Sequence, residues 1–389
     1  MRKQVVIIGG GPSGLLLAKL LAQSDIDCIV LEKHTKQHVL SRVRAGILEE
    51  GSVRLLEKAG VSNRLHKEGF KHDGIFLSSK NASFRIDFKK LVNKCVTVYG
   101  QTEITADLYN SFEKTGIIVN SALHVALDDL TSKNPKVSFV HKNQRKVVSC
   151  DFVIGCDGFH GVTRQQIPNT HCRVFERMYP FGWLGVLSET PPVSNELIYV
   201  NHENGFALAS MRNERLSRYY IQTDIRDSVD NWSDQRFWDE IRRRLPTEAA
   251  ETLITGSSIE KSIATLRSFV TEPMQYGNLF LVGDAAHIVP PTGAKGLNLA
   301  FSDVYYLHEA ISTFYENNNT ALVDQYSTLA LKRIWGAIRF SWWMTMNLHK
   351  FPEQSFFDQR IQRAELDHLI NSRNAQINFS QNYVGLPLK

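Results

Sequence analysis

Three glycines near the start of the chain have the spacing and the flanking residues of a phosphate-binding turn. Gly9, Gly11 and Gly14 follow the apolar run at residues 5–8 and precede an apolar stretch dense enough for a buried helix. At this spacing the first glycine permits a tight turn, the second lets backbone approach a pyrophosphate, and the third lets helix and strand pack closely. Glu32 ends the next apolar run, where a carboxylate can bind a ribose diol. The stretch predicts a site for an adenine dinucleotide, either FAD or NAD(P).

Two later turns repeat the combination of an apolar run, a glycine and an aspartate. Asp157-Gly158 follows a strand predicted at residues 146–154, and its carboxylate falls at the sheet edge where ligands bind in α/β folds, although it also suits a simple turn. Gly283-Asp284 follows the apolar run at residues 279–282, and Asp284 can accept a hydrogen bond from a ribityl hydroxyl. The loop at residues 290–298 then opens a predicted helix whose N-terminus can stabilise negative charge. The third turn therefore favours a ligand contact.

The segment that follows Glu32 is basic and could be a solvated loop. It carries Lys33, His34, Lys36, His38, Arg42 and Arg44. The two arginines are at alternate positions, so both would point the same way from an extended segment. Because arginine suits bidentate phosphate contacts, we predict that Arg42 and Arg44 meet the phosphates of the cofactor.

The surrounding elements predict an α/β fold with a Rossmann-like domain, a mixed-sheet substrate domain and a helical C-terminal region. Residues 46–69 indicate two helices, residues 70–98 short strands inserted into the dinucleotide-binding unit, and residues 105–115 another helix. Aromatic, alternating runs between residues 174 and 259 indicate antiparallel strands, with a helix at 232–245. We divide the chain into residues 1–173, 174–268 and 269–389. The C-terminal tryptophans are expected to pack in the core or against a second subunit.

Composition excludes several classes of function. The 389 residues are enough for two or three lobes, and a formal net charge of +5 without dense clusters suits an anionic small molecule better than nucleic acid. We expect the basic run at residues 242–244 to be a solvated helix face. Five scattered cysteines form no metal pattern and indicate free thiols in a reducing cytoplasm. No signal peptide or membrane-spanning run is expected.

Taken in order, the three glycine turns resemble those of the flavin-dependent aromatic hydroxylases. Further stretches carry the resemblance nearly end to end, to the members that act on 4-hydroxybenzoate: residues 41–46, 99–103, 179–183, 290–298 and 382–387. The resemblance implies a homodimeric FAD enzyme that uses NAD(P)H and O2 to convert 4-hydroxybenzoate into 3,4-dihydroxybenzoate. In that family reduced flavin forms a C4a-hydroperoxide, which attacks only an electron-rich ring.

The resemblance also assigns roles to individual residues. It implies FAD contacts, besides the glycine turn, at Ser13, Glu32, Arg42, Arg44, Gln101, Asp284, Leu297 and Asn298, with Asp157 nearby. It implies that the substrate carboxylate meets Ser210, Arg212 and Tyr220, that the phenol meets Tyr199, and that Pro291 offers a carbonyl near the ring. Tyr383 would stand behind Tyr199, with His72 as the solvent end of a proton relay that helps form the phenolate.

Two departures limit what is transferred from the family. Gly161 stands where the wider hydroxylase pattern often carries serine, which leaves the local phosphate and ribose contacts open. The loop at residues 33–38 governs the choice of pyridine nucleotide in this family, and Lys33 and Lys36 favour NADPH over NADH. The NAD(P)H contacts implied are Lys33, His34, His38, Arg44, His160 and Arg267.

Three other functions remain open at this point. The same chemistry could act on another hydroxy- or aminobenzoate, because pocket dimensions are not encoded in a motif. A flavin-binding protein without turnover is disfavoured, since it gives no reason to place Tyr199, Arg212 and Tyr383 together. A plain NAD(P) dehydrogenase is disfavoured because it would not need the Gly283-Asp284 loop.

Overall fold

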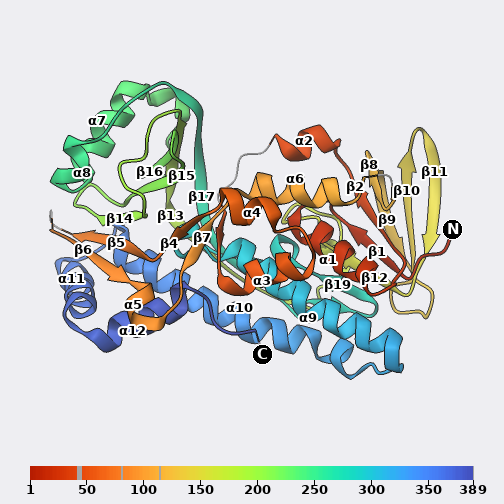
Figure 1. The fold of residues 1–389 in the computed structure, drawn as a ribbon. Helices are drawn as coiled ribbons and strands as arrows, with labels where there is room; N and C mark the ends of the chain where they lie inside the picture. Colours follow the sequence, from red (N-terminus) through yellow and green to blue (C-terminus); the bar gives the residue numbers. More distant parts are fainter. Residues whose placement is uncertain (42–45, 80–81, 114, 389) are drawn as a thin grey trace.

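Two large β-sheets organise the molecule. The structure is a computed structural model that describes residues 1–41, 46–79, 82–113 and 115–388. Figure 1 shows the sheets toward opposite ends, with the long helices α9 (Gly296–Asn317) and α10 (Ala321–Leu348) running along the bottom of the view. Arg42 and Arg44, both predicted to contact phosphate, lie outside the described residues.

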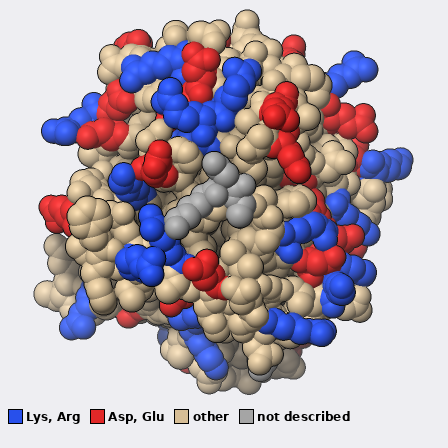
Figure 2. All heavy atoms as spheres, turned by 90° about the vertical axis from the view of Figure 1, so that its left-hand side faces the viewer, with Lys and Arg blue, Asp and Glu red and all other residues tan. Residues whose placement is uncertain are grey.

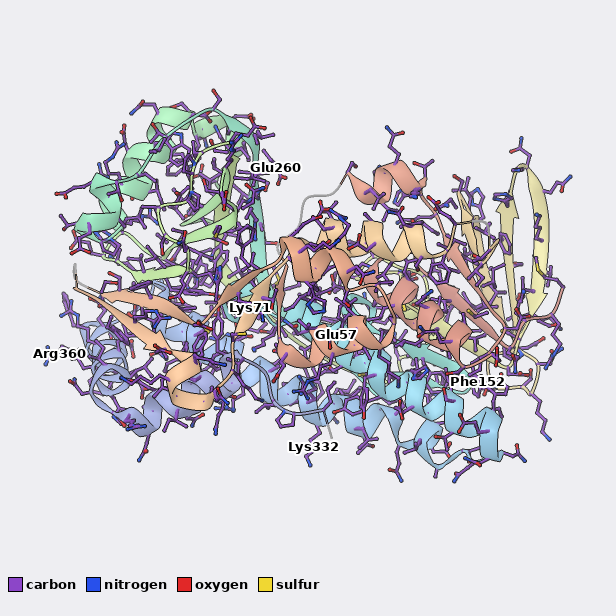
Figure 3. All side chains as sticks on the ribbon, in the orientation of Figure 1. Glu57, Lys71, Phe152, Glu260, Lys332 and Arg360 are labelled. Carbon is purple, nitrogen blue, oxygen red and sulfur yellow. The ribbon has the colours of Figure 1, made fainter. Side chains whose placement is uncertain are left out.

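The first sheet contains the predicted dinucleotide unit. Its strand order is β18 (Gln275–Tyr276), β19 (Leu279–Leu281), β12 (Phe152–Gly155), β1 (Val5–Ile8), β2 (Cys28–Glu32) and β8 (Ile118–Asn120), with only β18 antiparallel to its neighbour. Strands β1, β2 and β12 are buried along their whole length, which explains their unbroken apolar runs. Helix α1 (Pro12–Gln23) packs against α6 (Gln101–Ser111) and α9. Phe152, labelled in Figure 3, fills the core beside β1.

The second sheet has eight strands and carries the predicted substrate residues. Its order is β20 (His287–Ile288), β17 (Ser258–Glu272), β13 (Arg173–Ser188), β16 (Leu216–Asp224), β15 (Ala207–Asn213), β14 (Ile198–Asn201), β5 (Gly74–Ser79) and β6 (Ala82–Asp87). Neighbouring strands are antiparallel except β14 and β5, which are parallel. The strands predicted as an insertion in the first domain therefore extend the substrate sheet. The division of the chain into three domains stays a prediction.

Smaller elements connect the two sheets. Two three-stranded sheets have the orders β11 (Gln144–Ser149), β10 (Lys136–His141), β9 (Leu123–Asp128) and β3 (Ile47–Leu48), β7 (Val96–Val98), β4 (Phe70–His72). The predicted helical pair at residues 46–69 is observed as α3 (Glu50–Lys58) and α4 (Asn63–Glu68). Helix α6 begins four residues before the predicted start. Short elements complete the chain: α2 (Lys36–Leu40), α5 (Phe88–Val92), and the 3-10 turns η1 (Arg164–Gln166), η2 (Val229–Asn231), η3 (Gly283–Ala285) and η4 (Pro291–Gly293).

The two faces of the eight-stranded sheet are covered by different helices. Helices α7 (Asp234–Arg244) and α8 (Thr247–Glu251) pack on the face that carries Leu184, Ile198 and Tyr219. Helices α5, α10, α11 (Phe356–Asn371) and α12 (Arg373–Tyr383) contribute to a second cluster that contains Trp183 and Tyr199. Because side chains alternate along each strand, one face of the sheet packs on α7 and α8, and the other face packs on the C-terminal helices.

Arg244 corrects the expectation of a solvated basic run. Arg242 and Arg243 are exposed on α7, but Arg244 is buried. Its guanidinium pairs with Glu240 at 2.8 Å and donates to the backbone carbonyls of Phe206 and Gln222, each at 3.0 Å. The prediction failed because a run of like residues does not reveal which one faces the sheet.

On the face of the molecule in Figure 2, acidic and basic side chains are interspersed.

Among the described residues, no helix is long and apolar enough to cross a membrane. The five cysteines are unpaired, and Cys28, Cys150 and Cys156 are buried. The cytoplasmic location remains a prediction.

We predict an acid-dependent loss of stability at His349, which follows α10 and is fully buried. Burial lowers the pKa of its imidazole from the ordinary 6.5 to about 3. Below pH 6.5 the unfolded chain therefore binds a proton that the folded chain does not. This contribution is complete above pH 6.5 and falls by about 1.4 kcal/mol per pH unit as the pH drops toward 3. Urea unfolding at several pH values should give a shallower pH slope for His349→Phe, and equal slopes would contradict the prediction.

Candidate active site

The first glycine turn has the geometry needed to receive a diphosphate. Gly9 has a φ of +112°, and a Cβ there would lie 2.2 Å from the carbonyl oxygen of Cys156. A Cβ on Gly14 would lie 2.1 Å from the carbonyl oxygen of Gly9, so both positions require glycine for packing. A Cβ on Gly11 would meet no atom within 4 Å. Gly11 precedes the first turn of α1, where half-buried Ser13 also lies, so backbone N–H groups face an open space suited to phosphate.

These glycines make a prediction that separates packing from cofactor binding. Gly14→Ala should destabilise even the cofactor-free protein by about 1–3 kcal/mol, because the new methyl overlaps backbone. Gly11→Ala should change stability by less than about 1 kcal/mol and yet weaken FAD binding, since its methyl enters the space for the diphosphate. Thermal unfolding of the apoprotein and FAD titration measure the two effects. Unchanged FAD affinity in Gly11→Ala would remove this turn from the cofactor site.

Glu32 is held where a ribose can reach it. Its carboxylate accepts the backbone N–H of Gly10 at 2.7 Å and that of His34 at 2.8 Å, one on each oxygen. These bonds fix the carboxylate orientation and leave lone pairs for two hydroxyls of a diol. Glu32 is buried at the end of β2, a position compatible with the predicted contact to a ribose. The ribose contact itself stays a prediction.

The Asp157 turn explains the departure at Gly161. The carboxylate of Asp157 accepts from the backbone N–H of Thr163 at 3.0 Å and from its hydroxyl at 2.5 Å. A Cβ on Gly161 would lie 2.0 Å from the carboxyl carbon of Asp157, so serine cannot occupy this position with the turn as it stands. Burial raises the pKa of Asp157 despite these bonds. The carboxylate of Asp157 therefore stabilises its own turn. The next residue, Gly158, borders open space, because a Cβ added there would meet no atom within 4 Å.

The third turn is anchored from beneath by a histidine and an aspartate. Gly283 has a φ of +60° and donates its N–H to Asp303 at 2.9 Å. The same carboxylate oxygen contacts Nε2 of His287 at 2.7 Å, and both side chains are fully buried. Asp284 is exposed at the surface of the turn, where a ribityl chain could reach it. The sequence pattern identified the turn but not the His287–Asp303 support.

The loop between this turn and α9 places its predicted contacts unequally. Leu297, in the first turn of α9, is half-buried, as is Gln101 at the start of α6. The Asn298 side chain is fully used inside the protein: it accepts from Glu49 N and Ser52 Oγ and donates to the carbonyls of Ile47 and Ala294. Any FAD contact at Asn298 must therefore come from its backbone.

The register of the second sheet brings the predicted substrate residues onto one face. Tyr199 on β14 is opposite Leu208 on β15, and Leu208 is opposite Tyr220 on β16. Ser210 follows Leu208 by two residues, so its side chain leaves the sheet on the same side as Tyr199 and Tyr220. Arg212 lies at a shift in the register of β15, and its hydrogen bond to Tyr220 places it on this side as well. Gly185 on β13, opposite Tyr220, keeps this face free of a further side chain.

Arg212 is a buried cation whose donors are only partly used by the described residues. Its Nε and Nη1 are buried, and within the described part of the chain they have no hydrogen-bond partner. Burial lowers the pKa of the guanidinium, and its interaction with Tyr220, to whose hydroxyl oxygen it donates a hydrogen bond, opposes the shift. A buried cation with unused donors is costly unless an anion pairs with it. The planar fork suits a carboxylate, so the structure fits the predicted substrate end.

The two predicted relay tyrosines meet in the core. The hydroxyls of Tyr199 and Tyr383 lie 2.8 Å apart, and both residues are 1% exposed. Burial raises the pKa of both phenols above the ordinary value. Neither tyrosine is therefore ionised near neutral pH, and a proton can pass between them only if each hydroxyl accepts one as it gives one away.

His72 corrects the expectation of a relay end at the solvent. The residue is 1% exposed at the end of β4, and burial lowers the pKa of its imidazole. Both ring nitrogens are buried without a hydrogen-bond partner among the described residues. The sequence could not reveal this, because the burial of His72 depends on distant elements. Its part in the relay stays a prediction, and it would need bridging water.

Pro291 is exposed on the turn η4, and its carbonyl already accepts the backbone N–H of Ala294 at 2.9 Å. That carbonyl keeps one lone pair for a ligand. Its place near the substrate ring stays a prediction.

Comparison with known proteins decides the family. The model of the FAD binding domain matches residues 2–341. The p-hydroxybenzoate hydroxylase of Acinetobacter baylyi is 52% identical over 389 residues, which is 100% of this chain and 96% of that protein. The chain belongs to the FAD-dependent aromatic hydroxylases. It is an oxidoreductase of the flavin monooxygenase type, as predicted from the three glycine turns.

More distant relatives of this hydroxylase share the fold. The 3-amino-4-hydroxybenzoate 2-monooxygenase of Streptomyces cremeus is 25% identical and covers 93% of this chain and 92% of its own. The crystal structure of p-nitrophenol 4-monooxygenase from Pseudomonas putida superposes with a TM-score of 0.82 at 17% identity, over 99% of both chains. The predicted α/β architecture with a helical C-terminal region is confirmed.

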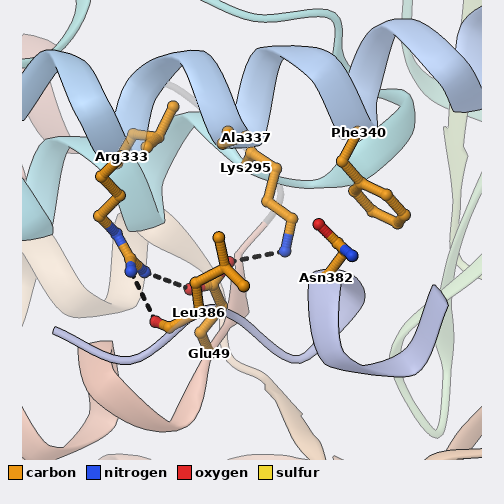
Figure 4. A pocket seen from close by; sticks show the side chains of 9 residues that line it. Glu49, Lys295, Arg333, Ala337, Phe340, Asn382 and Leu386 are labelled. Atoms are coloured by element: carbon orange, nitrogen blue, oxygen red, sulfur yellow. Dashed lines mark hydrogen bonds and ion pairs between the residues drawn. The ribbon is translucent and has the colours of Figure 1, made fainter. Parts of the chain in front are cut away.

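A buried ion cluster behind Tyr383 was not found from the sequence of this hydroxylase. Lys295 donates to one oxygen of Glu49 at 2.7 Å, and Arg333 donates to the other at 3.0 Å (Figure 4). Lys295 also donates to the carbonyl of Tyr383 at 2.7 Å. Arg333 also binds the carbonyl of Leu386 at 2.5 Å. The cluster fastens the C-terminal segment to the loop before α9, and so fixes the backbone of Tyr383.

The residues predicted to contact NAD(P)H lie in two places. Around the start of α2, Lys33 is exposed and the rings of His34 and His38 stack with centroids 4.2 Å apart. Near the Asp157 turn, Arg267 lies over the ring of Phe159, which also contacts exposed His160. Arg267 is paired with Glu176 at 3.4 Å. The two groups belong to different elements.

Proposed function

We propose that this hydroxylase converts 4-hydroxybenzoate to 3,4-dihydroxybenzoate, with FAD as the resident cofactor and with NADPH (or NADH) and O2 as cosubstrates. One observation carries the choice of substrate. Among the described residues, one face of the sheet offers the buried, unpartnered donors of Arg212 at one end and, at the other, the hydroxyl of Tyr199, which is paired with that of Tyr383 from α12. A ring with a carboxylate and a hydroxyl at opposite positions would satisfy both ends.

The cationic and the phenolic residues of the site would have different roles. Arg212 binds the carboxylate through its fork, and Tyr220 and Ser210 stand on the same face to complete the contacts. Tyr199 accepts the proton of the substrate hydroxyl as it passes its own to Tyr383. The resulting phenolate ring is rich in electrons, and FAD, when bound and reduced, would supply the activated oxygen that such a ring can accept. Because the site is buried, water is excluded while this happens.

Steady-state turnover tests the proposal. Purified protein should be yellow, and its oxidation of NADPH should rise sharply with 4-hydroxybenzoate. The panel should include benzoate, 3-hydroxybenzoate, 4-aminobenzoate and 3-amino-4-hydroxybenzoate, each with NADPH and NADH. Stimulation by another member and not by 4-hydroxybenzoate would overturn the substrate and keep the chemistry. A protein that is colourless and binds no FAD would overturn both.

A homodimer is part of the same proposal. Its support is the resemblance to a homodimeric family, together with exposed apolar side chains on α11, where Phe356 is 87% and Phe357 is 72% exposed. Light scattering should give twice the chain mass. A single-chain mass at micromolar concentration would overturn it.

A further inference from the structure

A buried hydrogen bond joins the substrate sheet to the end of helix α10. The indole Nε1 of Trp183, on β13, donates to Nε2 of His349 at 2.7 Å. His349 Nδ1 lies 3.0 Å from the carbonyl of Thr345, which can only accept. The imidazole must therefore be neutral with its proton on Nδ1, because a proton on Nε2 would face the indole N–H. Both side chains are at most 2% exposed.

Aromatic rings fix this pair from both sides. His349 is stacked on Phe181 at 4.7 Å and on Phe206 at 4.3 Å between centroids, and Phe206 also stacks on Trp183 at 4.7 Å. Stacking holds the plane of the imidazole, and the two hydrogen bonds hold its rotation. The pair thus has one arrangement and little freedom to move.

The stack touches both ends of the predicted substrate site. The ring centroids of Trp183 and Tyr220 lie 5.2 Å apart, at the end predicted to bind the substrate carboxylate. Those of Phe206 and Tyr199 lie 6.3 Å apart, at the end predicted to bind the substrate hydroxyl. Trp183 is opposite Gln222 on β16, so it leaves the sheet on the same face as Tyr220. The position of Trp183 therefore limits the positions of both tyrosines.

His349 is also connected to the loop before α9, through Thr345. Thr345, whose carbonyl binds His349, places its hydroxyl 3.0 Å from that of Thr292. Thr292 belongs to η4, next to Pro291, and is fully buried. A continuous set of hydrogen bonds thus runs from the substrate sheet through His349 and α10 to the loop before α9.

We propose that His349 is a positioning residue for the hydroxylation: by fixing Trp183 it sets the inner wall of the substrate site relative to the loop that carries Pro291. The proposal rests on the proposed function, since it concerns the binding and coupling of that substrate. Its consequence is geometric. A shift of about 1 Å at the wall can cost on the order of a hundredfold in rate without any change in the groups that react.

The test uses four variants of the holoenzyme. His349→Phe keeps the stacking ring and removes both hydrogen bonds of the imidazole. Trp183→Phe removes the donor, and the double variant removes both partners. Trp238→Phe is the matched control: Trp238 is buried and donates to Gly256 at 2.8 Å, but it lies on α7 and packs on the opposite face. Its loss should lower the unfolding temperature and leave turnover unchanged.

We expect three results, measured by calorimetric titration of 4-hydroxybenzoate and by product formed per NADPH oxidised. His349→Phe and Trp183→Phe should each raise the substrate dissociation constant roughly tenfold and lower the product yield at least twofold, with FAD content unchanged. The double variant should recover thermal stability, because no buried donor or acceptor of the bond is left unpaired. Its product yield should stay low, since the wall is still untethered.

The opposite results would overturn the proposal. If His349→Phe and Trp183→Phe fold and keep wild-type affinity and yield, the pair does not position the site. If yield recovers together with stability in the double variant, the bond serves only folding. If His349→Phe fails to fold, Trp183→Phe and the double variant decide. Failure of the proposed function is distinct, because wild-type enzyme would then show no stimulation by 4-hydroxybenzoate.

Discussion

Replacing Arg212 by alanine should weaken the binding of 4-hydroxybenzoate by about 2–5 kcal/mol. The reason is the unusual state of this side chain, whose Nε and Nη1 are buried without a partner in the described structure. A carboxylate that enters the site finds donors already stripped of water, and it alone pairs them. The dissociation constant from calorimetric titration measures the loss, which corresponds to about 30- to 5,000-fold.

Two controls make the Arg212 experiment specific. 4-Hydroxybenzaldehyde lacks the carboxylate, so its weaker binding should change little in Arg212→Ala. Arg212→Lys keeps the charge and loses the fork, and it should fall between alanine and wild type. In the absence of ligand, Arg212→Met should raise the unfolding temperature, because an unpaired buried charge has been removed. An unchanged dissociation constant in Arg212→Ala would rule out the carboxylate role.

The parts of the site that could be predicted from sequence are those with local patterns. Gly9, Gly11 and Gly14 are constrained by a strand and a helix on either side, so their spacing alone predicts the turn. Glu32 ends an apolar run, and Asp284 follows another with one glycine between, so local patterns also predict these two carboxylates. Tyr199, Arg212 and Tyr383 were assigned only through the resemblance, because alone each would read as a core or surface residue.

The parts that could not be predicted join distant segments of the chain. Lys295 and Glu49 are separated by 246 residues, and Trp183 and His349 by 166. No spacing rule connects such positions, and a glutamate or a histidine that ends up buried looks the same in sequence as an exposed one. The same limit explains why the burial of His72 and Arg244 was not predicted, since it is decided by elements far along the chain.

Asn298 shows how a family resemblance can name the right residue and leave its role open. The resemblance implies a contact with FAD, yet the four hydrogen bonds of the side chain are all made inside the protein. They tie the first turn of α9 to Glu49 and Ile47. The side chain therefore shapes the loop before α9, which is predicted to contact FAD, and the ion cluster and Asn298 support that loop together.

The second large effect is expected at Tyr199. Tyr199→Phe should keep FAD and bind 4-hydroxybenzoate within about threefold of wild type, but the yield of 3,4-dihydroxybenzoate per NADPH should fall below about one tenth. The variant removes the hydroxyl that we propose takes the substrate proton, and a positioned acid–base group contributes about 10²–10⁴-fold. Without it the ring stays a phenol, and activated oxygen is released as peroxide. Product chromatography and a peroxide assay measure the partition.

Tyr383→Phe is the matched variant, because it leaves Tyr199 in place but ends the relay one step later. Both hydroxyls belong to one 2.8 Å bond, so the double variant should lose little more yield than either single variant. Raising the pH toward the pKa of the substrate phenol should restore part of the yield in Tyr199→Phe, since solvent then removes the proton before binding. Full coupling in Tyr199→Phe, or a yield independent of pH, would show that the proton leaves by another route.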